Sequence, residues 1–490
     1  MKISAYKILF VLVVFFFLIT RLYRIADLPS SVYWDEASIG YNAFSIATDL
    51  KDEWGSFLPV HFRAFGEFKL PVYIYSVVPF VKVLGLNAFS VRIPAVIYSL
   101  GTLLLTYLLV SKITGKKWPG VLSGFILSVS PWFFIFSRTG YEATAGVFFL
   151  LLSVYLFLCN SKKLIIFFLG TVSIILSMYS YTSFRLISPL VFAMFLIRVI
   201  KLYFVNKSIK RNIYIPVLSL IIFLLSLIPI ARLFLFDAGF GRAQTFALIP
   251  GFQQVYDLSG KPHLQITYNR SGHVDWKENI STIGANYLSH FSPNFLLWKG
   301  DANPRSQIPG HGQLYWIDIP LFILGIYAIY KKRSFIFLIP LLLLLLAPIP
   351  ASLTRESPHA LRSILAAPAF AMITSIGVWY IAEKINIKKF SVIFIAVISI
   401  IYYLSFELYA MDFVLKYQNL TSHDWQYDYK EIFVDKKESG VVTDKYGQPY
   451  IFALYYLKYP PEKFRNEVKY NPVDKWGFSL VSSFDGFQFK

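Results

Sequence analysis

Two adjacent carboxylates, Asp35 and Glu36, are the first residues in this sequence whose types and spacing could support catalysis. Apolar residues recur after them at helical spacing, namely Ile39, Ala43, Ile46, Ala47 and Leu50. This stripe predicts a helix that is too short and too polar to span a bilayer but can lie along its surface. At the start of such a helix, the carboxylates could serve as a general base and a cation site. Asp35 could equally be an N-cap, which the helix dipole favours.

Basic residues follow close to where the chain would re-enter lipid. Glu67 and Lys69 precede Pro71, and Arg92 precedes Pro94. A lysine at such a position could hold a lipid phosphate as a point charge. Lys69 and Arg92 could also simply extend toward the lipid headgroups, as long basic side chains near a membrane commonly do.

Two later turns between apolar runs are unusually rich in charge. The first contains Arg138 and Glu142, and the second contains His359 and Arg362. Ionisable side chains at membrane depth are costly and are therefore functional candidates by default. A charge in a solvated loop explains these residues equally well, except for Arg362, which begins a long apolar run. No pair of histidines has a metal-ligand spacing such as His-Glu-x-x-His.

The elements that must position these side chains are membrane-spanning helices. Of the 490 residues, 56% are hydrophobic and only 15% are charged, whereas ordinary globular chains carry about 25% charged residues. The single cysteine, Cys159, excludes a disulfide framework and a cysteine-based zinc site. Eleven apolar runs are candidate spans, approximately 8–20, 93–111, 118–136, 143–159, 164–181, 186–200, 213–236, 314–330, 334–350, 361–382 and 390–410. The sequence therefore predicts an all-α polytopic membrane protein.

The net charge of +19 follows the predicted membrane topology. If the N-terminus is cytoplasmic, the inner segments contain eighteen basic residues and one acidic residue, Glu383. The positive-inside rule then accounts for 17 of the 19 net charges, so the basicity does not indicate a nucleic-acid partner. This topology predicts a multi-pass protein of the cell membrane whose candidate residues lie on the extracytoplasmic side.

The same topology divides the chain into two parts. Residues 1–410 form the predicted membrane core, with large outer loops at 21–92 and 237–313. Residues 411–490 form a small outward-facing domain. Strand-like and helical stretches alternate in this domain, and they predict an α/β fold.

The chain resembles the GT-C superfamily of membrane glycosyltransferases, within the branch of protein O-mannosyltransferases and lipid A aminoarabinose transferases. The resemblance rests on the order and spacing of four motifs: Trp34-Asp35-Glu36, Phe68-Lys69-Leu70-Pro71-Val72-Tyr73, Val91-Arg92-Ile93-Pro94, and Ser137-Arg138 followed by Glu142. It covers roughly residues 10–200, and the loop from His359 to Arg362 fits the same layout. The middle loop and the C-terminal tail are not covered.

The resemblance implies a helical membrane core with an outward-facing active site and inversion at the anomeric carbon of the sugar. It also implies that Asp35 is the base or a cation ligand and that Lys69 contacts the donor phosphate. Glu142 stands where the family usually has an aspartate. With Asp35 it would hold a divalent cation, which is the one cofactor we expect. The family's usual Lys-Pro-Pro is Lys-Leu-Pro here.

The expected partners are a polyprenyl-phosphate sugar donor, a protein, lipid or glycan acceptor, and membrane lipids. An oligosaccharyltransferase should carry a Trp-Trp-Asp motif in a large C-terminal domain, but this tail has Asp424-Trp425-Gln426-Tyr427-Asp428. A lipid-linked sugar flippase or transporter should have mid-membrane charges and an internal repeat, and the sequence shows neither. A non-catalytic membrane scaffold would leave the acidic and basic loop residues unexplained.

Overall fold

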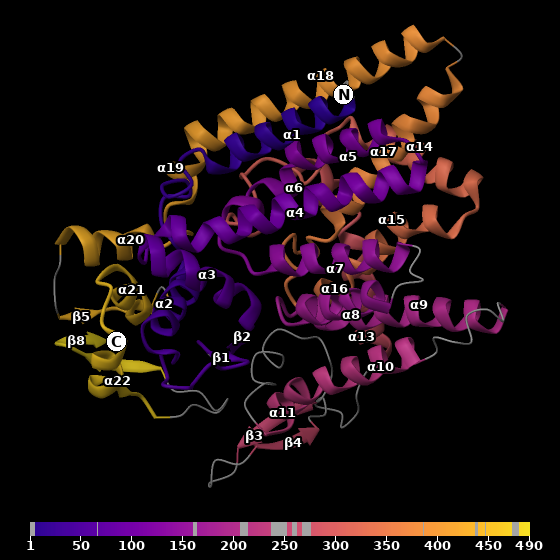
Figure 1. The fold of residues 1–490 in the computed structure, drawn as a ribbon. Coiled ribbons are helices and arrows are strands. Elements are labelled where there is room, and N and C mark those ends of the chain that lie inside the picture. The colour runs from indigo at the N-terminus through magenta and orange to yellow at the C-terminus, as the bar shows by residue number, and fades with distance from the viewer. Residues whose placement is uncertain are drawn as a thin grey trace.

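The computed structural model describes residues 5–65, 67–159, 164–205, 214–236, 252–256, 262–266, 276–385, 387–436, 440–445, 447–472 and 480–490. The described chain is mostly helical. Helices from the first half of the sequence pack beside helices from the last third, so that α4 and α5 contact α17 (Figure 1). The helix bundle therefore combines helices from the first half of the sequence with helices from its last third.

All eleven apolar runs contain helices. These are α1 (Ala5–Leu22), α4 (Ala88–Thr114), α5 (Lys117–Val129), α7 (Ala143–Leu158), α8 (Leu164–Met178), α9 (Phe184–Val205), α10 (Tyr214–Ser226), α11 (Ile228–Phe236), α14 (Asp318–Lys332), α15 (Phe335–Leu346), α17 (Ala366–Lys384) and α18 (Lys388–Asp412). Shorter pieces lie between or after them, namely α6 (Pro131–Phe134), η1 (Phe136–Arg138), α13 (Trp276–Ser289), η3 (Asn294–Trp298), α16 (Ile349–Ser352), η4 (Phe413–Tyr417), α19 (Gln418–Thr421), α20 (Tyr427–Lys430) and η5 (Glu431–Lys436).

Fewer helices than predicted have the length of a complete span. Among the described residues, six helical stretches are long and apolar enough to cross a membrane, or seven if α5 and the segment after it count as one span bent by 70°. The apolar helices α7 and α8 have only 16 and 15 residues, which is short of the roughly 20 that a span needs. The six apolar helical stretches of spanning length indicate that the chain is a membrane protein.

The first loop folds into α2 (Trp34–Asp49), a two-stranded hairpin and α3 (Pro71–Leu84). In the hairpin, β1 (Phe62–Arg63) pairs antiparallel with β2 (Phe68–Lys69). We expected α2 to lie on the membrane surface, but protein covers it on several sides. A Cβ atom at Gly40 would lie 2.8 Å from the ring of Tyr455, which belongs to the C-terminal domain. Ile39, Ala43 and Ile46 of the apolar stripe are buried inside the protein, whereas Leu50 at its end is 48% exposed.

The C-terminal region combines a sheet with helices, as its alternating sequence predicted. Its four-stranded sheet has the order β5 (Val441–Val442), β8 (Phe487–Phe489), β7 (Val481–Phe484) and β6 (Lys469–Tyr470). Helices α21 (Pro449–Tyr456) and α22 (Pro461–Glu467) belong to the same region, and α21 packs on α2. A separate hairpin, β3 (Phe252–Tyr256) with β4 (Pro262–Ile266), belongs to the middle loop.

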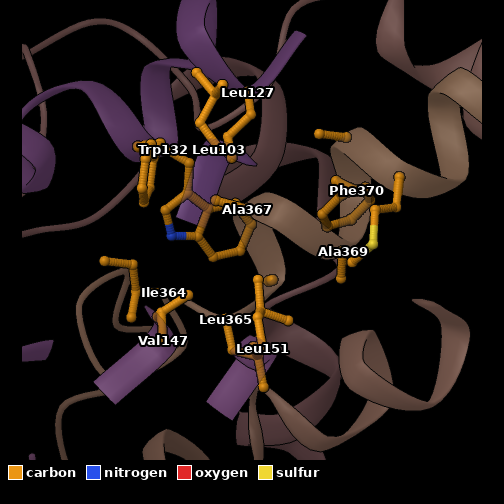
Figure 2. Packing of buried hydrophobic residues seen from close by; sticks show 14 of the residues in the cluster. Leu103, Leu127, Trp132, Val147, Leu151, Ile364, Leu365, Ala367, Ala369 and Phe370 are labelled. Carbon is orange, nitrogen blue, oxygen red and sulfur yellow. The ribbon is translucent and has the colours of Figure 1, made fainter. Parts of the chain in front are cut away.

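The membrane core links the loops of the two halves of the chain. Figure 2 shows Trp132 packed among apolar residues of both halves, including Leu103, Val147 and Ile364. A buried indole N–H needs a hydrogen-bond acceptor, and Trp132 Nε1 donates to the carbonyl of Ala360 at 3.0 Å. This bond ties the loop that contains His359 and Arg362 to the helices of the first half.

Candidate active site

A cavity of about 250 Å³ lies where the first loop meets four other segments of the chain. Its walls come from the start of α2, from β2, and from the segments 141–142, 180–182, 303–306 and 356–362. Six of the nine residues proposed from the sequence line it: Asp35, Glu67, Lys69, Glu142, His359 and Arg362. The remaining three, Glu36, Arg92 and Arg138, do not reach it.

Lys69 is the cation at the centre of this cavity. It is 5% exposed, and its register opposite Phe62 in the β1–β2 hairpin fixes its backbone. Its ammonium donates a short hydrogen bond to Asp35 Oδ1 and a second bond of 3.3 Å to Glu67 Oε1. Burial lowers the pKa of Lys69, but the carboxylates of Asp35 and Glu142 outweigh burial and raise it overall. Because its pKa is raised above the ordinary value of a lysine, Lys69 is charged at neutral pH.

Asp35 is the second residue of α2, and the structure does not use it as the helix cap. The helix begins at Trp34, and the N-cap residue Tyr33 makes no side-chain cap bond. The N–H of Trp34 instead donates to Gln426 Oε1 of the C-terminal region at 3.0 Å. The N-cap interpretation of Asp35 is therefore wrong, and its carboxylate points to Lys69.

Glu142 is the second acidic wall of the cavity. It precedes the first helical residue of α7 and is 9% exposed. Burial raises the pKa of Glu142 to about 7, the charge of Lys69 opposes this rise, and the charge of Asp35 adds to it. A carboxyl with this pKa exchanges its proton near neutral pH, which suits acid–base chemistry.

Glu36 and Arg92 form a closed pair behind the wall of the cavity. Both side chains are fully buried, and Arg92 Nε and Nη2 donate to the two oxygens of Glu36, each at 2.9 Å. Glu36 Oε1 also accepts the backbone N–H of Gly140 at 2.7 Å. The remaining N–H groups of Arg92 donate to backbone carbonyls between Ile25 and Ser31. We therefore withdraw the catalytic role of Glu36 and the substrate-binding role of Arg92.

Arg138 also supports the backbone and does not line the cavity. It is 1% exposed, and its guanidinium donates to the carbonyls of Thr20, Tyr23 and Leu28 at 2.7–3.1 Å. These bonds hold the chain leaving α1. Arg138, a functional candidate by its charge in the turn that also contains Glu142, therefore has a structural role.

The loop after α16 brings His359 and Arg362 to the opposite side of the cavity. Arg362 donates to Thr354 Oγ1 at 2.8 Å and to Glu356 Oε2 at 3.0 Å. His359 Nδ1 lies 3.4 Å from a carboxylate oxygen of Asp301, a residue of the middle loop. Both side chains are thus held by neighbouring polar groups while they face the cavity.

Arg305 is a cavity residue that the sequence reasoning missed. Its guanidinium lies over the ring of Tyr33, 5.0 Å from the ring centre. Burial lowers the pKa of Arg305, but the nearby tyrosines and Asp35 raise it overall. The turn that presents it has a recognisable signal, because Asn303 Oδ1 accepts the N–H of Arg305 and Asp301 Oδ1 accepts that of Asn303. The sequence Asp301-Ala-Asn303-Pro-Arg305 encodes this turn.

The carboxylates of the cavity fit a lysine better than they fit a metal ion. Among the described residues, no group of three His, Cys, Asp or Glu side chains is placed to hold a metal. Asp35 was expected to share a cation with Glu142, but the ammonium of Lys69 already contacts Asp35. We therefore assign no step of the chemistry to a metal.

The fold is shared with solved structures of ArnT and of the oligosaccharyltransferase AglB. One solved structure with this fold is ArnT from Cupriavidus metallidurans bound to undecaprenyl phosphate, with a TM-score of 0.57 and 11% identity over 93% of this chain and 86% of that one. Another is the oligosaccharyltransferase AglB from Archaeoglobus fulgidus in complex with an inhibitory peptide and a dolichol-phosphate, with a TM-score of 0.51 and 12% identity over 92% of this chain. This chain spans 63% of the length of AglB. A further structure of the Archaeoglobus fulgidus oligosaccharyltransferase, in complex with Zn and sulfate, matches with a TM-score of 0.51 and 11% identity over 91% of this chain and 61% of that one. No family model and no curated protein sequence matches the chain.

Proposed function

We propose that this protein is an integral membrane glycosyltransferase that moves a sugar from a polyprenyl-phosphate donor to a hydroxyl group of a protein, lipid or glycan. The observation that carries this proposal is the buried, charged Lys69, which shares one cavity with Asp35, Glu67 and Glu142. A fixed cation beside carboxylates supplies what a sugar transfer from a phosphate needs, namely a site for the leaving anion and an acceptor for a proton.

Lys69 is placed to bind the donor phosphate. An ammonium has three N–H donors, of which Asp35 and Glu67 each accept one, so one remains for a phosphate oxygen. Arg305 and Arg362 line the same cavity and add positive charge around that position. Two of the three structures described above hold undecaprenyl phosphate and dolichol-phosphate, which supports a lipid phosphate as the ligand.

The reaction is a direct displacement at the anomeric carbon. The acceptor oxygen uses a lone pair to form the new glycosidic bond, and the bond from carbon to the phosphate oxygen breaks with its electron pair on the phosphate. Asp35 takes the proton of the acceptor hydroxyl, and Lys69 stabilises the departing phosphate. One displacement inverts the configuration of the sugar carbon.

The membrane arrangement proposed with this function has eleven spans. The shorter helices α7 and α8 cross the bilayer in this arrangement as parts of the packed bundle. The lysine-rich helix turns then face the cytoplasm together with the N-terminus, following the positive-inside rule. The cavity at Lys69 faces the extracytoplasmic side, where the polyprenyl-phosphate sugar and the acceptor meet.

The decisive experiment is a turnover assay with purified protein and a panel of polyprenyl-phosphate sugars. We expect release of free polyprenyl phosphate from at least one donor, and loss of this release in Asp35→Asn. A protein that moves lipid-linked sugars across liposomes without breaking the sugar–phosphate bond would be a flippase, and that result would overturn the proposal.

A further inference from the structure

A second, larger hollow lies on the outside of the helix bundle. Its volume is about 1100 Å³, and it is bounded by α1, α5 and the junction of α17 with α18, which lie together in Figure 1. It shares no lining residue with the cavity around Lys69. The glycosyl-transfer chemistry therefore leaves this hollow unexplained.

The walls of this hollow are suited to hydrocarbon. Its lining includes Leu9 and Leu12 of α1, Val121 of α5, and Ile395 and Ala396 of α18. The two serine hydroxyls of the walls are satisfied by backbone carbonyls, since Ser391 Oγ donates to Ala382 at 3.1 Å and Ser399 Oγ donates to Ile395 at 2.9 Å. These serine hydroxyls therefore need no hydrogen-bond partner from a ligand.

One end of the hollow is polar and basic. Lys116, Lys117 and Trp118 line it at the turn between α4 and α5, together with Glu383 at the end of α17. Lys116 Nζ pairs with Glu383 Oε1 at 2.5 Å, and Lys117 makes no ion pair with the described residues. The apolar groove suits the acyl chains of a lipid, and Lys117 suits an anionic headgroup. Trp118 lies at the same end, where the interfacial region of such a lipid would be.

We propose that this hollow binds one anionic glycerophospholipid, with its acyl chains between α1 and α18 and its phosphate at Lys117. Basic pockets between transmembrane helices on the cytoplasmic side recognise anionic headgroups by this combination of charge and hydrocarbon. In the orientation proposed above, the lipid belongs to the cytoplasmic leaflet. A second copy of the chain fits the hollow poorly, because it would bring its own lysine-rich turns to the same level of the membrane.

Native mass spectrometry of the detergent-solubilised full chain tests this site. The protein is mixed with equal amounts of phosphatidylglycerol and phosphatidylcholine that carry identical acyl chains. We expect one phosphatidylglycerol to be retained in preference to phosphatidylcholine. Lys117→Gln should lower that retention about fivefold, the effect of one juxtamembrane basic charge, and Lys117→Arg should preserve it.

Two further variants separate this site from general lipid association. Lys331→Gln removes a charge from the last turn of α14, which does not line the hollow, and should leave the retention unchanged. Ala396→Trp fills the hollow from the exposed face of α18 and should lower the retention of both lipids. Equal retention of the two lipids, or equal effects of Lys117→Gln and Lys331→Gln, would overturn the proposal. So would a dimer of this chain that Ala396→Trp dissociates.

Discussion

Asp35 and Glu36 are neighbours in the sequence, yet their carboxylates point to opposite sides of the wall of the cavity. Asp35 bonds to Lys69 in the cavity, whereas Glu36 is fully buried against Arg92. Successive helix residues point about 100° apart, since one turn takes 3.6 residues, and this difference lets Asp35 reach Lys69 while Glu36 reaches Arg92. The two acids that looked equivalent in the sequence therefore have separate roles, which the first two predictions distinguish.

Asp35→Asn should lower turnover by at least 100-fold and leave donor binding close to that of the wild type. The amide keeps the size of the side chain but cannot take a proton from the acceptor hydroxyl. Turnover is measured as polyprenyl phosphate release, and donor affinity is measured separately by titration. A variant that keeps more than about a tenth of the wild-type rate would remove Asp35 from the role of base and leave Glu142 as the remaining carboxyl.

Glu36→Gln should act on stability instead. The substitution leaves the buried charge of Arg92 uncompensated, and breaking a buried ion pair in this way costs about 3–5 kcal/mol. Thermal unfolding in detergent measures the effect, with Asp35→Asn as the matched control at the adjacent position. If Glu36→Gln unfolds at the wild-type temperature but has lost turnover, Glu36 has the catalytic role that we withdrew.

Lys69→Met should weaken donor binding by roughly 10- to 150-fold, and Lys69→Arg should weaken it much less. The range corresponds to the loss of one hydrogen bond to a charged group, worth about 1.5–3 kcal/mol. Equilibrium binding of a polyprenyl-phosphate sugar measures the difference. Equal affinities of the wild type and Lys69→Met would show that Lys69 does not contact the donor.

Donor affinity should depend on pH through Glu142. Because burial raises the pKa of Glu142 to about 7, its carboxylate carries a charge above pH 7 and loses it below. The donor phosphate stays anionic throughout this range, so the repulsion between the two groups disappears as the pH falls through 7. We expect donor affinity to rise by roughly tenfold between pH 8.5 and pH 5.5, the effect of about 1.4 kcal/mol of repulsion. Glu142→Gln should bind with one affinity across this range, and a persistent pH dependence in this variant would assign it to another group.

The ordered motifs within the first 142 residues were sufficient to predict that Asp35, Lys69 and Glu142 lie near one another, and the three residues line one cavity. The motifs did not distinguish cavity residues from buried ones. Arg92 lies near a proline in an apolar run, as Lys69 does, and only its pairing with Glu36 across 56 positions removes it from the cavity. Each of the eleven apolar runs contains a helix, but only six or seven helical stretches of the described residues have the length of a complete span, because hydropathy does not set helix length.

The motifs did not place Arg305 or Gln426, because these residues come from the middle loop and the C-terminal tail, which the motifs do not cover. The local turn signal before Arg305 predicts a turn but not that the turn reaches the cavity. Gln426 reaches Trp34 from 392 positions away. A contact of that range depends on how the C-terminal region packs against α2, and neither helical spacing nor local turn chemistry encodes it.

The bond from Trp34 to Gln426 also joins an early part of the chain to a late one. Ribosomes make the segment with Asp35 first, but the side chain that completes the start of its helix follows after α18. Trp425 packs against Tyr33 in the same contact, with ring centres 5.5 Å apart. Until the C-terminal region has been made and has packed on α2, the start of the helix that carries Asp35 lacks both of these contacts. The C-terminal region is therefore a structural part of the wall that holds Asp35 in the cavity.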